Sequence, residues 1–145
     1  MDKSIYDIYN MLQEIAWHFG NRGFEEECCE DLTLVEFMAL KKVCDNKCFS
    51  IQEIGSALNF TKSGATRIID RLENKEYVRR ERSPIDGRVC CVTVTGKGKS
   101  VISKVTGQYT AYLEEMLMGL EPRRVESIKD ALETLAELIQ RQETI

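Results

Sequence analysis

The sequence contains little histidine, no long apolar run and none of the short motifs that mark common enzyme sites. His18 is the only histidine, and there is no H-E-x-x-H sequence and no phosphate-binding glycine loop. No apolar run approaches the ~20 residues that a membrane-spanning helix needs. The first residues, MDKSIYDIYNML, are amphipathic and acidic, unlike a secretion signal. We therefore expect a cytoplasmic chain that is not an enzyme.

Charge is divided unevenly along a chain of otherwise ordinary composition. With 145 residues, 43% hydrophobic and 30% charged, the chain has the composition of one soluble globular domain. Its net charge is −4, yet residues 61–99 contain ten Lys or Arg and five Asp or Glu. Residues 1–60 contain five Lys or Arg and eleven Asp or Glu, and residues 100–145 contain five Lys or Arg and eight Asp or Glu. Such a basic block can attract a polyanion, although a charge run on a solvated face gives the same counts.

Residues 61–95 are expected to form a helix followed by a β-hairpin. At helical spacing, one face of the helix is apolar and consists of Ala65, Ile68, Ile69 and Leu72. The other face carries short hydroxyls and cations, namely Lys62, Ser63, Thr66, Arg67 and Arg71. Strand-like residues 77–82 and 89–94 flank a turn at Pro84-Ile85-Asp86-Gly87. A helix followed by a basic-tipped hairpin suits a surface for DNA.

Two capping motifs predict further helices before this stretch. Thr33 with Glu36 forms a T-x-x-E capping box for a helix that extends to about Val43. Ser50 with Glu53 forms a second box for a shorter helix. Each box supplies partners for the backbone N–H groups that a helix start leaves unpaired.

The second of these helices and the helix in residues 61–95 are close enough in sequence to form a helix-turn-helix. Asn59-Phe60 is a tight connection, and Thr61 can cap the following helix. Gly55, inside the first member, would permit close packing of the two helices. In this arrangement the second helix enters the major groove of DNA.

Both ends of the chain carry apolar seams at helical spacing. The residues step by 3, 4, 3 and 4 positions in Ile5, Ile8, Leu12, Ile15 and Phe19, and again in Val125, Ile128, Leu132, Leu135 and Ile139. Between the seams, a long helix is expected from Gly96 to about Leu120, and Pro122 suits the first turn of the last helix. Because exposed seams are costly, we favour a homodimer interface over packing within one subunit.

The hairpin carries the most specific family signature. Asp86-Gly87-Arg88 followed by Val92-Thr93-Val94-Thr95-Gly96-Lys97-Gly98 is similar to the pattern D-x-R-x-x-x-V-x-L-T-x-x-G. On this motif the chain resembles the MarR (multiple antibiotic resistance regulator) family of winged-helix transcription factors, from about Ile5 to Ile139. It departs from the family pattern at Val94, where Leu is usual, and at Glu76, where Gly normally follows the recognition helix.

The resemblance implies a mainly α (α+β) fold, a winged helix-turn-helix with long terminal helices that form a dimerisation region. Within a single domain of residues 1–145, it assigns residues 1–31 and 100–145 to dimerisation and residues 32–99 to the DNA-binding lobe. It implies an obligate homodimer that represses transcription from a pseudo-palindromic operator and is released by a small effector. No cofactor is required. A winged-helix protein-interaction module without DNA binding is the alternative class of function.

The resemblance also implies a role for each polar residue of the recognition helix and the wing. Ser63, Thr66 and Arg67 would face bases in the major groove, and Lys62 and Arg71 would lie nearer phosphates. Arg88 would enter the flanking minor groove, with Asp86 orienting its guanidinium. A guanidinium suits the negative potential of a narrow minor groove. A simple turn with a surface ion pair is the alternative for the last two residues.

Six cysteines are unusual for this architecture. They are Cys28, Cys29, Cys44, Cys48, Cys90 and Cys91. A cytosolic chain is not expected to hold a structural disulfide framework, and without C-x-x-C neither a thioredoxin-like motif nor a zinc ribbon is indicated. The last four are therefore expected to be structural thiols. Strand alternation would bury Cys90 on the face of Val92 and Val94.

Cys28 and Cys29 lie among carboxylates and form a separate hypothesis. Thiolates beside carboxylates could bind a metal, with His18 as a nitrogen ligand. The acidic neighbours raise the pKa of a thiol, however, which argues against a fast peroxide sensor. A metal- or thiol-responsive regulator is therefore an alternative to one released by an organic ligand.

Overall fold

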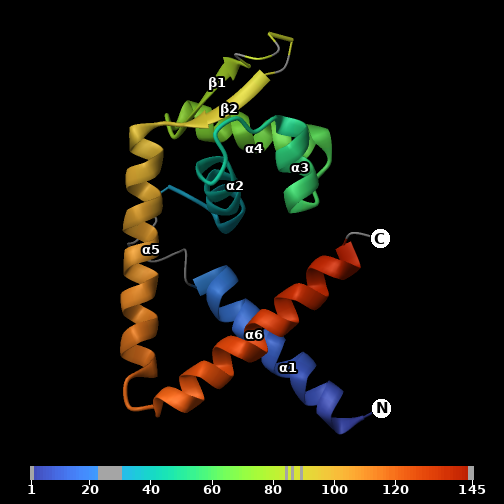
Figure 1. Ribbon diagram of the computed structural model, residues 1–145, viewed down its shortest axis with the longest axis vertical. Helices are drawn as coiled ribbons and strands as arrows, with labels where there is room; N and C mark the ends of the chain where they lie inside the picture. The colour runs from blue at the N-terminus through green and yellow to red at the C-terminus, as the bar shows by residue number, and fades with distance from the viewer. Residues whose placement is uncertain (1, 23–30, 84, 86, 89, 144–145) are drawn as a thin grey trace. The chain divides into compact units, whose positions relative to one another are not determined.

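The computed structural model describes residues 2–22, 31–83, 85, 87–88 and 90–143, and they are mainly helical (Figure 1). The elements in order are α1 (Lys3–Trp17), the π-helical turn η1 (His18–Arg22), α2 (Leu34–Cys44), α3 (Ile51–Leu58), α4 (Lys62–Asn74), β1 (Val78–Arg82), β2 (Cys90–Val94), α5 (Gly96–Leu117) and α6 (Pro122–Glu143). The strands form one antiparallel two-stranded sheet. The predicted fold class, helix-turn-helix and hairpin are confirmed.

The chain divides into two compact units whose boundary falls within α5. Residues 1–106 form the first unit and residues 107–145 the second. The first contains the helix-turn-helix, its hairpin and α1. The second contains the end of α5 and α6. Among the described residues, no helix is both long enough and apolar enough to cross a membrane.

Side-chain caps start the three helices of the lobe, as predicted. Ser50 and Glu53 form a complete capping box, with the Ser50 Oγ accepting from Glu53 N–H at 3.0 Å and the Glu53 Oε1 accepting from Ser50 N–H at 3.3 Å. Thr61 Oγ1 accepts from the backbone N–H of Gly64 at 3.0 Å. These bonds satisfy backbone donors that have no partner inside the helix.

At the start of α2 only half of the predicted capping box forms. Thr33 Oγ1 accepts from Glu36 N–H at 3.1 Å, as expected. The Glu36 carboxylate instead accepts from the Thr33 hydroxyl at 3.1 Å and pairs with Lys75. Glu36 Oε1 thus bonds to the Thr33 hydroxyl and Glu36 Oε2 to the distant cation Lys75, whereas the capping-box pattern predicted a bond to the Thr33 backbone N–H.

The core of the first unit lies between α2, α3, α4 and the hairpin. Its side chains with almost no exposure include Leu40, Val43, Ile54, Ile69, Leu72, Val78, Val92 and Val105. The predicted apolar face of α4 is buried as expected, at Ala65, Ile68, Ile69 and Leu72. Because this face is fully used by the core, the polar face of α4 is directed away from it.

The hairpin pairs Val78 with Val94 and Arg82 with Cys90. Phe49, just before α3, adds an isolated antiparallel bridge to Val92, whose N–H donates to the Phe49 carbonyl at 2.8 Å. The sheet is thereby tied to the segment that leads into the helix-turn-helix.

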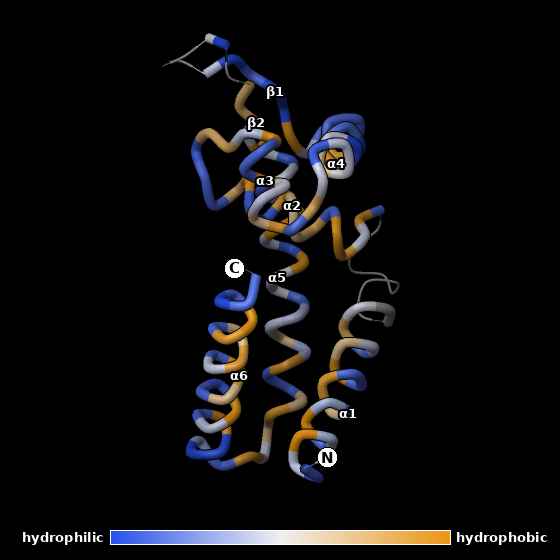
Figure 2. The backbone as a smooth tube through the Cα atoms, turned by 90° about the vertical axis from the view of Figure 1, so that its right-hand side faces the viewer, coloured by the Kyte–Doolittle hydropathy of each residue, from blue (hydrophilic) through white to orange (hydrophobic). Residues whose placement is uncertain are grey.

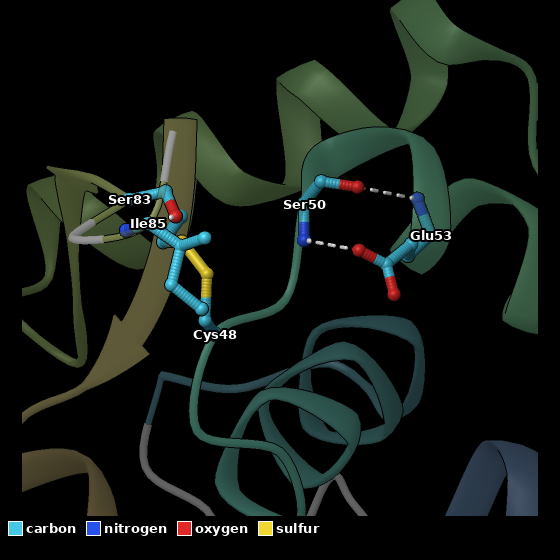
Figure 3. The surroundings of a disulfide bond; sticks show 6 residues. Cys48, Ser50, Glu53, Ser83 and Ile85 are labelled. Atoms are coloured by element: carbon cyan, nitrogen blue, oxygen red, sulfur yellow. Dashed lines mark hydrogen bonds between the residues drawn. A yellow bond between two sulfur atoms is a disulfide. The ribbon is translucent and has the colours of Figure 1, made fainter. Parts of the chain in front are cut away.

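Two expectations for the cysteines are wrong. Cys90, which was predicted to be buried, is exposed, because it begins β2 opposite exposed Arg82, at the end nearest the wing tip. Cys48 and Cys91 are not separate structural thiols but are joined by a disulfide (Figure 3). The bridge between Phe49 and Val92 brings these two cysteines together, although 43 positions separate them in sequence.

The predicted apolar seams of the terminal helices are exposed in the single chain. Neither α1 nor α6 has a buried residue. Ile5 is 59% exposed and Ile15 48%, while Leu132 is 52% exposed and Ile139 50%. Figure 2 shows that each turn of α6 contains both hydrophobic and hydrophilic residues. Each helix therefore presents an apolar stripe that its own unit does not cover.

Gly98 should be the most sensitive of the glycines that the structure describes. A Cβ at this position would lie 2.3 Å from the Tyr77 carbonyl oxygen and 2.7 Å from Val94 Cγ2. We expect Gly98→Ala to lower the free energy of unfolding by about 1–3 kcal/mol, as overpacking typically does. Urea denaturation measures this change.

Gly107→Ala is the matched control, since it lies in the same helix and its Cβ would meet nothing within 4 Å. It should stabilise the protein, by about 0.5–1 kcal/mol, because alanine is the better helix former. Equal effects of the two substitutions would contradict the close approach of α5 to Tyr77 and to Val94 of β2.

Candidate nucleic-acid interface

The polar face of α4 consists of Lys62, Ser63, Thr66, Arg67 and Arg71. All are exposed except Thr66, which is half-buried. The Thr66 hydroxyl donates to the Lys62 carbonyl at 2.8 Å, while Thr61 Oγ1 lies 3.4 Å from Ser63 Oγ. The structure thus brings the five predicted helix residues together on one accessible face that carries three cations.

The turn before α4 sets the angle at which this helix leaves α3. Asn59 ends α3 in the left-handed region, at φ 61°, which asparagine tolerates better than most residues. Gly55 lies where a Cβ would approach the Phe60 carbonyl oxygen to 3.2 Å and Ala65 Cβ to 3.5 Å. The close helix packing predicted at Gly55 is confirmed.

Arg80, a residue that the sequence did not single out, joins the hairpin to α4. Its Nη1 donates to Glu73 Oε1 at 2.6 Å and its Nη2 donates to Asp70 Oδ1. Its backbone N–H donates to Glu73 Oε2 at 3.2 Å. Partial burial lowers the pKa of Arg80, but the hydrogen bonds and charges of the two carboxylates outweigh it and raise the pKa above its ordinary value. The guanidinium is therefore a permanent cation that neutralises acidic groups beside the polar face.

A second network of polar contacts, separate from those of Arg80, holds the C-terminal end of α4. Glu36 is only 3% exposed, and its Oε2 lies 2.6 Å from Lys75 Nζ. Lys75 Nζ also donates to the Asp31 carbonyl, and Tyr77 Oη donates to Asp31 Oδ1 at 2.9 Å. Lys97 Nζ, from the first turn of α5, donates to the Lys75 carbonyl at 2.9 Å. The end of α4 is thus fixed to α2, the start of β1 and α5.

Comparison with known proteins finds similarity to one family. Residues 32–90 match the model described as MarR family. The HTH-type transcriptional regulator MhqR of Bacillus subtilis is 29% identical over 70% of each chain. Other curated relatives are matched over about half of their own length, 51% in one case and 43% in another. These matches show that residues 32–90 are similar to the MarR family.

Solved structures of MarR proteins share the fold. A MarR family protein from Bacillus stearothermophilus is 20% identical, with a TM-score of 0.84 over 97% of this chain and 99% of that one. Streptococcus pneumoniae FabT, solved in complex with DNA, is also 20% identical, with a TM-score of 0.70 over 97% of this chain and 95% of FabT. The family and its curated relatives are transcriptional regulators rather than enzymes, as the sequence led us to expect.

The remaining predicted site residues of this chain are only partly described. Arg88 is exposed near the wing tip. Asp86, Cys28 and Cys29 lie outside the described residues, so the pairing of Asp86 with Arg88 and the sensing role of the two thiols stay predictions. His18, in η1, is half-buried, and its ring meets Phe19 edge-on at 4.9 Å between centroids. Within the described part of the chain, no three His, Cys, Asp or Glu side chains gather as metal ligands would.

Glu76 occupies the backbone position that the MarR family normally gives to glycine. Its φ is 67°, its N–H donates to the Glu73 carbonyl at 2.9 Å, and the next N–H, of Tyr77, donates to the Leu72 carbonyl at 3.0 Å. This is the Schellman arrangement, which ends α4 at Asn74 and favours glycine at the left-handed residue. The departure from the family pattern is therefore a strained residue in an otherwise ordinary helix end.

We expect Glu76→Gly to raise the free energy of unfolding by about 0.5–1 kcal/mol, because glycine adopts a positive φ without steric cost. Thermal and urea denaturation measure the gain. Glu76→Ala is the control: it removes the same carboxylate but keeps a Cβ, so it should give no such gain. A matching rise in both variants would locate the effect in charge and not in backbone strain.

Proposed function

We propose that this protein is a dimeric, sequence-specific DNA-binding regulator that represses transcription from a pseudo-palindromic operator and is released by a small effector. The observation that carries this proposal is the two-sided character of α4. One side is buried in the core, and the other exposes Lys62, Arg67 and Arg71 with no large apolar residue between them. The complex of the similarly folded FabT with DNA supports it.

The division of roles follows from position and chemistry. Ser63, Thr66 and Arg67 lie on the polar face of α4 and read base edges in the major groove, while Lys62 and Arg71 bind phosphates. Arg88 enters the adjacent minor groove, oriented by Asp86. Phosphate contacts release condensed counterions, so binding falls steeply with salt.

Dimerisation sets the spacing of two such surfaces. The exposed apolar seams of α1 and α6 are of the kind that a second copy covers. We assign residues 1–31 and 100–145 to the dimerisation region and residues 32–99 to the DNA-binding lobe. Two-fold symmetry then requires half-sites about one helical turn, roughly 10 base pairs, apart. A regulator of this kind acts in the cytoplasm and needs no cofactor.

Arg67→Ala and Lys62→Ala should weaken binding in different ways. The duplex for the measurement is first selected from a random-sequence pool. Loss of a base contact at Arg67 should cost about 1–3 kcal/mol and relax the base preference at one position in each half-site. Loss of a phosphate contact at Lys62 should weaken all duplexes alike and reduce the slope of log K against log salt by about 1 per subunit.

Fluorescence anisotropy across a salt series, with every single-base variant of the selected duplex, separates the two effects. If both variants change only the salt slope, α4 does not read bases. If the parent shows no steep salt dependence on any duplex, the chain is a protein-interaction module that does not bind DNA.

Arg88→Ala should leave a dimer that binds the selected duplex about 10-fold or more weakly, since a guanidinium in a narrow minor groove is lost. Anisotropy measures affinity at physiological salt, and analytical ultracentrifugation measures the dimer. Arg141→Ala in the last turn of α6 removes the same charge from another exposed site and serves as control. Unchanged affinity of the Arg88 variant would contradict the role given to the wing.

A further inference from the structure

The segment before α3 is linked covalently to the second strand of the hairpin. Cys48 and Cys91 form a disulfide with a Cα–Cα distance of 5.0 Å. Figure 3 shows this bond beside the capping box of Ser50 and Glu53, which starts α3. The bond therefore lies at the point where the helix-turn-helix begins and the hairpin returns to it.

The two sulfurs have different surroundings. Cys91 is 2% exposed and is the second residue of β2. Cys48 is exposed, in the connection between α2 and α3. Immediately beside the bond, Val92 N–H donates to the Phe49 carbonyl at 2.8 Å. The disulfide and this hydrogen bond together form a clamp between β2 and the start of α3.

The clamp closes a loop that contains the whole proposed DNA-binding surface. Between Cys48 and Cys91 lie α3, α4, β1 and the wing tip. All seven proposed DNA contacts, from Lys62 to Arg88, fall inside this loop. A covalent bond at its base restricts how the two ends of the loop move relative to each other.

We propose that Cys48 and Cys91 are a reversible redox pair, a modification site for peroxides whose disulfide form clamps the wing to the helix-turn-helix. The site is separate from the hypothesis on Cys28 and Cys29. Disulfides in a reducing cytosol are rare, and those that occur are mostly redox-active. The consequence for DNA binding rests on the proposed function, whereas the clamp itself does not.

The chemistry begins at Cys48, the exposed residue of the pair. The Cys48 thiolate attacks one peroxide oxygen, the O–O bond breaks, and Cys48 sulfenic acid and hydroxide form; hydroxide takes a proton to become water. Cys91 Sγ then attacks the Cys48 sulfur, and a second water leaves as the S–S bond forms. The two thiols give up two electrons in total, which reduce one peroxide to two waters. A low-molecular-weight thiolate reverses the bond by attacking Cys48 Sγ, which releases the Cys91 thiolate and leaves a mixed disulfide on Cys48. A second thiolate of the same kind then attacks the sulfur of the small molecule in that mixed disulfide, which releases the Cys48 thiolate and the oxidised dimer of the small thiol.

The full-length protein tests the clamp without DNA. After hydrogen peroxide, peptide mapping should recover Cys48 linked to Cys91, and excess reduced glutathione should release the link. Hydrogen exchange of the peptide containing Val92 should be about 10-fold or more slower in the oxidised form. The melting temperature should rise by roughly 5–15 °C when the loop is closed.

Cys48→Ser removes the bond at an exposed position, so the fold should survive and behave like the reduced parent under both conditions. Cys90→Ser, at the neighbouring exposed cysteine, is the control and should respond like the parent. Three outcomes would overturn the pair: no Cys48–Cys91 peptide after peroxide, a link that excess glutathione never releases, or equal exchange in both forms.

Affinity for the selected duplex tests the regulatory consequence. Preorganisation of the loop should make the oxidised parent bind about 3-fold or more tightly than the reduced parent, with no such difference in Cys48→Ser. Equal affinity of the two forms would remove the regulatory role. If hydrogen exchange differs between the oxidised and reduced proteins but neither binds DNA, the proposed function is contradicted and the clamp is supported.

Discussion

The position of the wing depends on one guanidinium shared by two carboxylates of α4. Asp70 and Glu73 lie one helical turn apart, and Arg80 reaches both while its own backbone N–H bonds to Glu73. A single exposed ion pair contributes little to stability. Here the planar fork of the guanidinium and the third bond restrict direction as well as distance. The direction of β1, and through the strand register that of β2, follows from this contact.

The buried carboxylate of Glu36 plays the complementary part at the other side of α4. A charge this far from water is tolerated only with a partner, and Lys75 provides one from the end of α4. The backbone carbonyl of Lys75 accepts a hydrogen bond from the Lys97 ammonium group of α5. Glu76, whose φ is positive, turns the chain into β1. Helix α4 is therefore held from two sides, and the contacts that keep it in place do not use its polar face.

Local signals in the sequence were sufficient to predict most of the helices and the hairpin. Capping residues such as Ser50 and Thr61 act within three positions, and an apolar stripe repeats within a turn, so both can be read without knowing the fold. The polar face of α4 follows directly from the same spacing. Interactions between distant residues could not be read in this way. The residues next to Glu36 in the sequence do not predict its ion pair with Lys75. Likewise, the residues next to Arg80 in the sequence do not predict that it pairs with Asp70 and Glu73 and is not simply solvated.

The cysteines show the same limit. Strand alternation correctly placed Cys90 on the face of buried Val92, but it does not state where along a strand the cover ends, and Cys90 pairs with exposed Arg82 at the uncovered end. The disulfide between Cys48 and Cys91 depends on the bridge from Phe49 to Val92, which joins segments more than forty positions apart.

The hydrogen bond of Thr66 also limits what this residue can recognise. Its hydroxyl has one proton, and that proton is already given to the Lys62 carbonyl. Toward a base in the major groove the side chain therefore offers lone pairs and a methyl group, but no donor. The amino groups of adenine and cytosine can donate to these lone pairs, and the thymine methyl can contact the threonine methyl. The acceptors on the major-groove edge of guanine receive no hydrogen bond from this side chain. In the proposed complex, the helix backbone thus helps to choose the base.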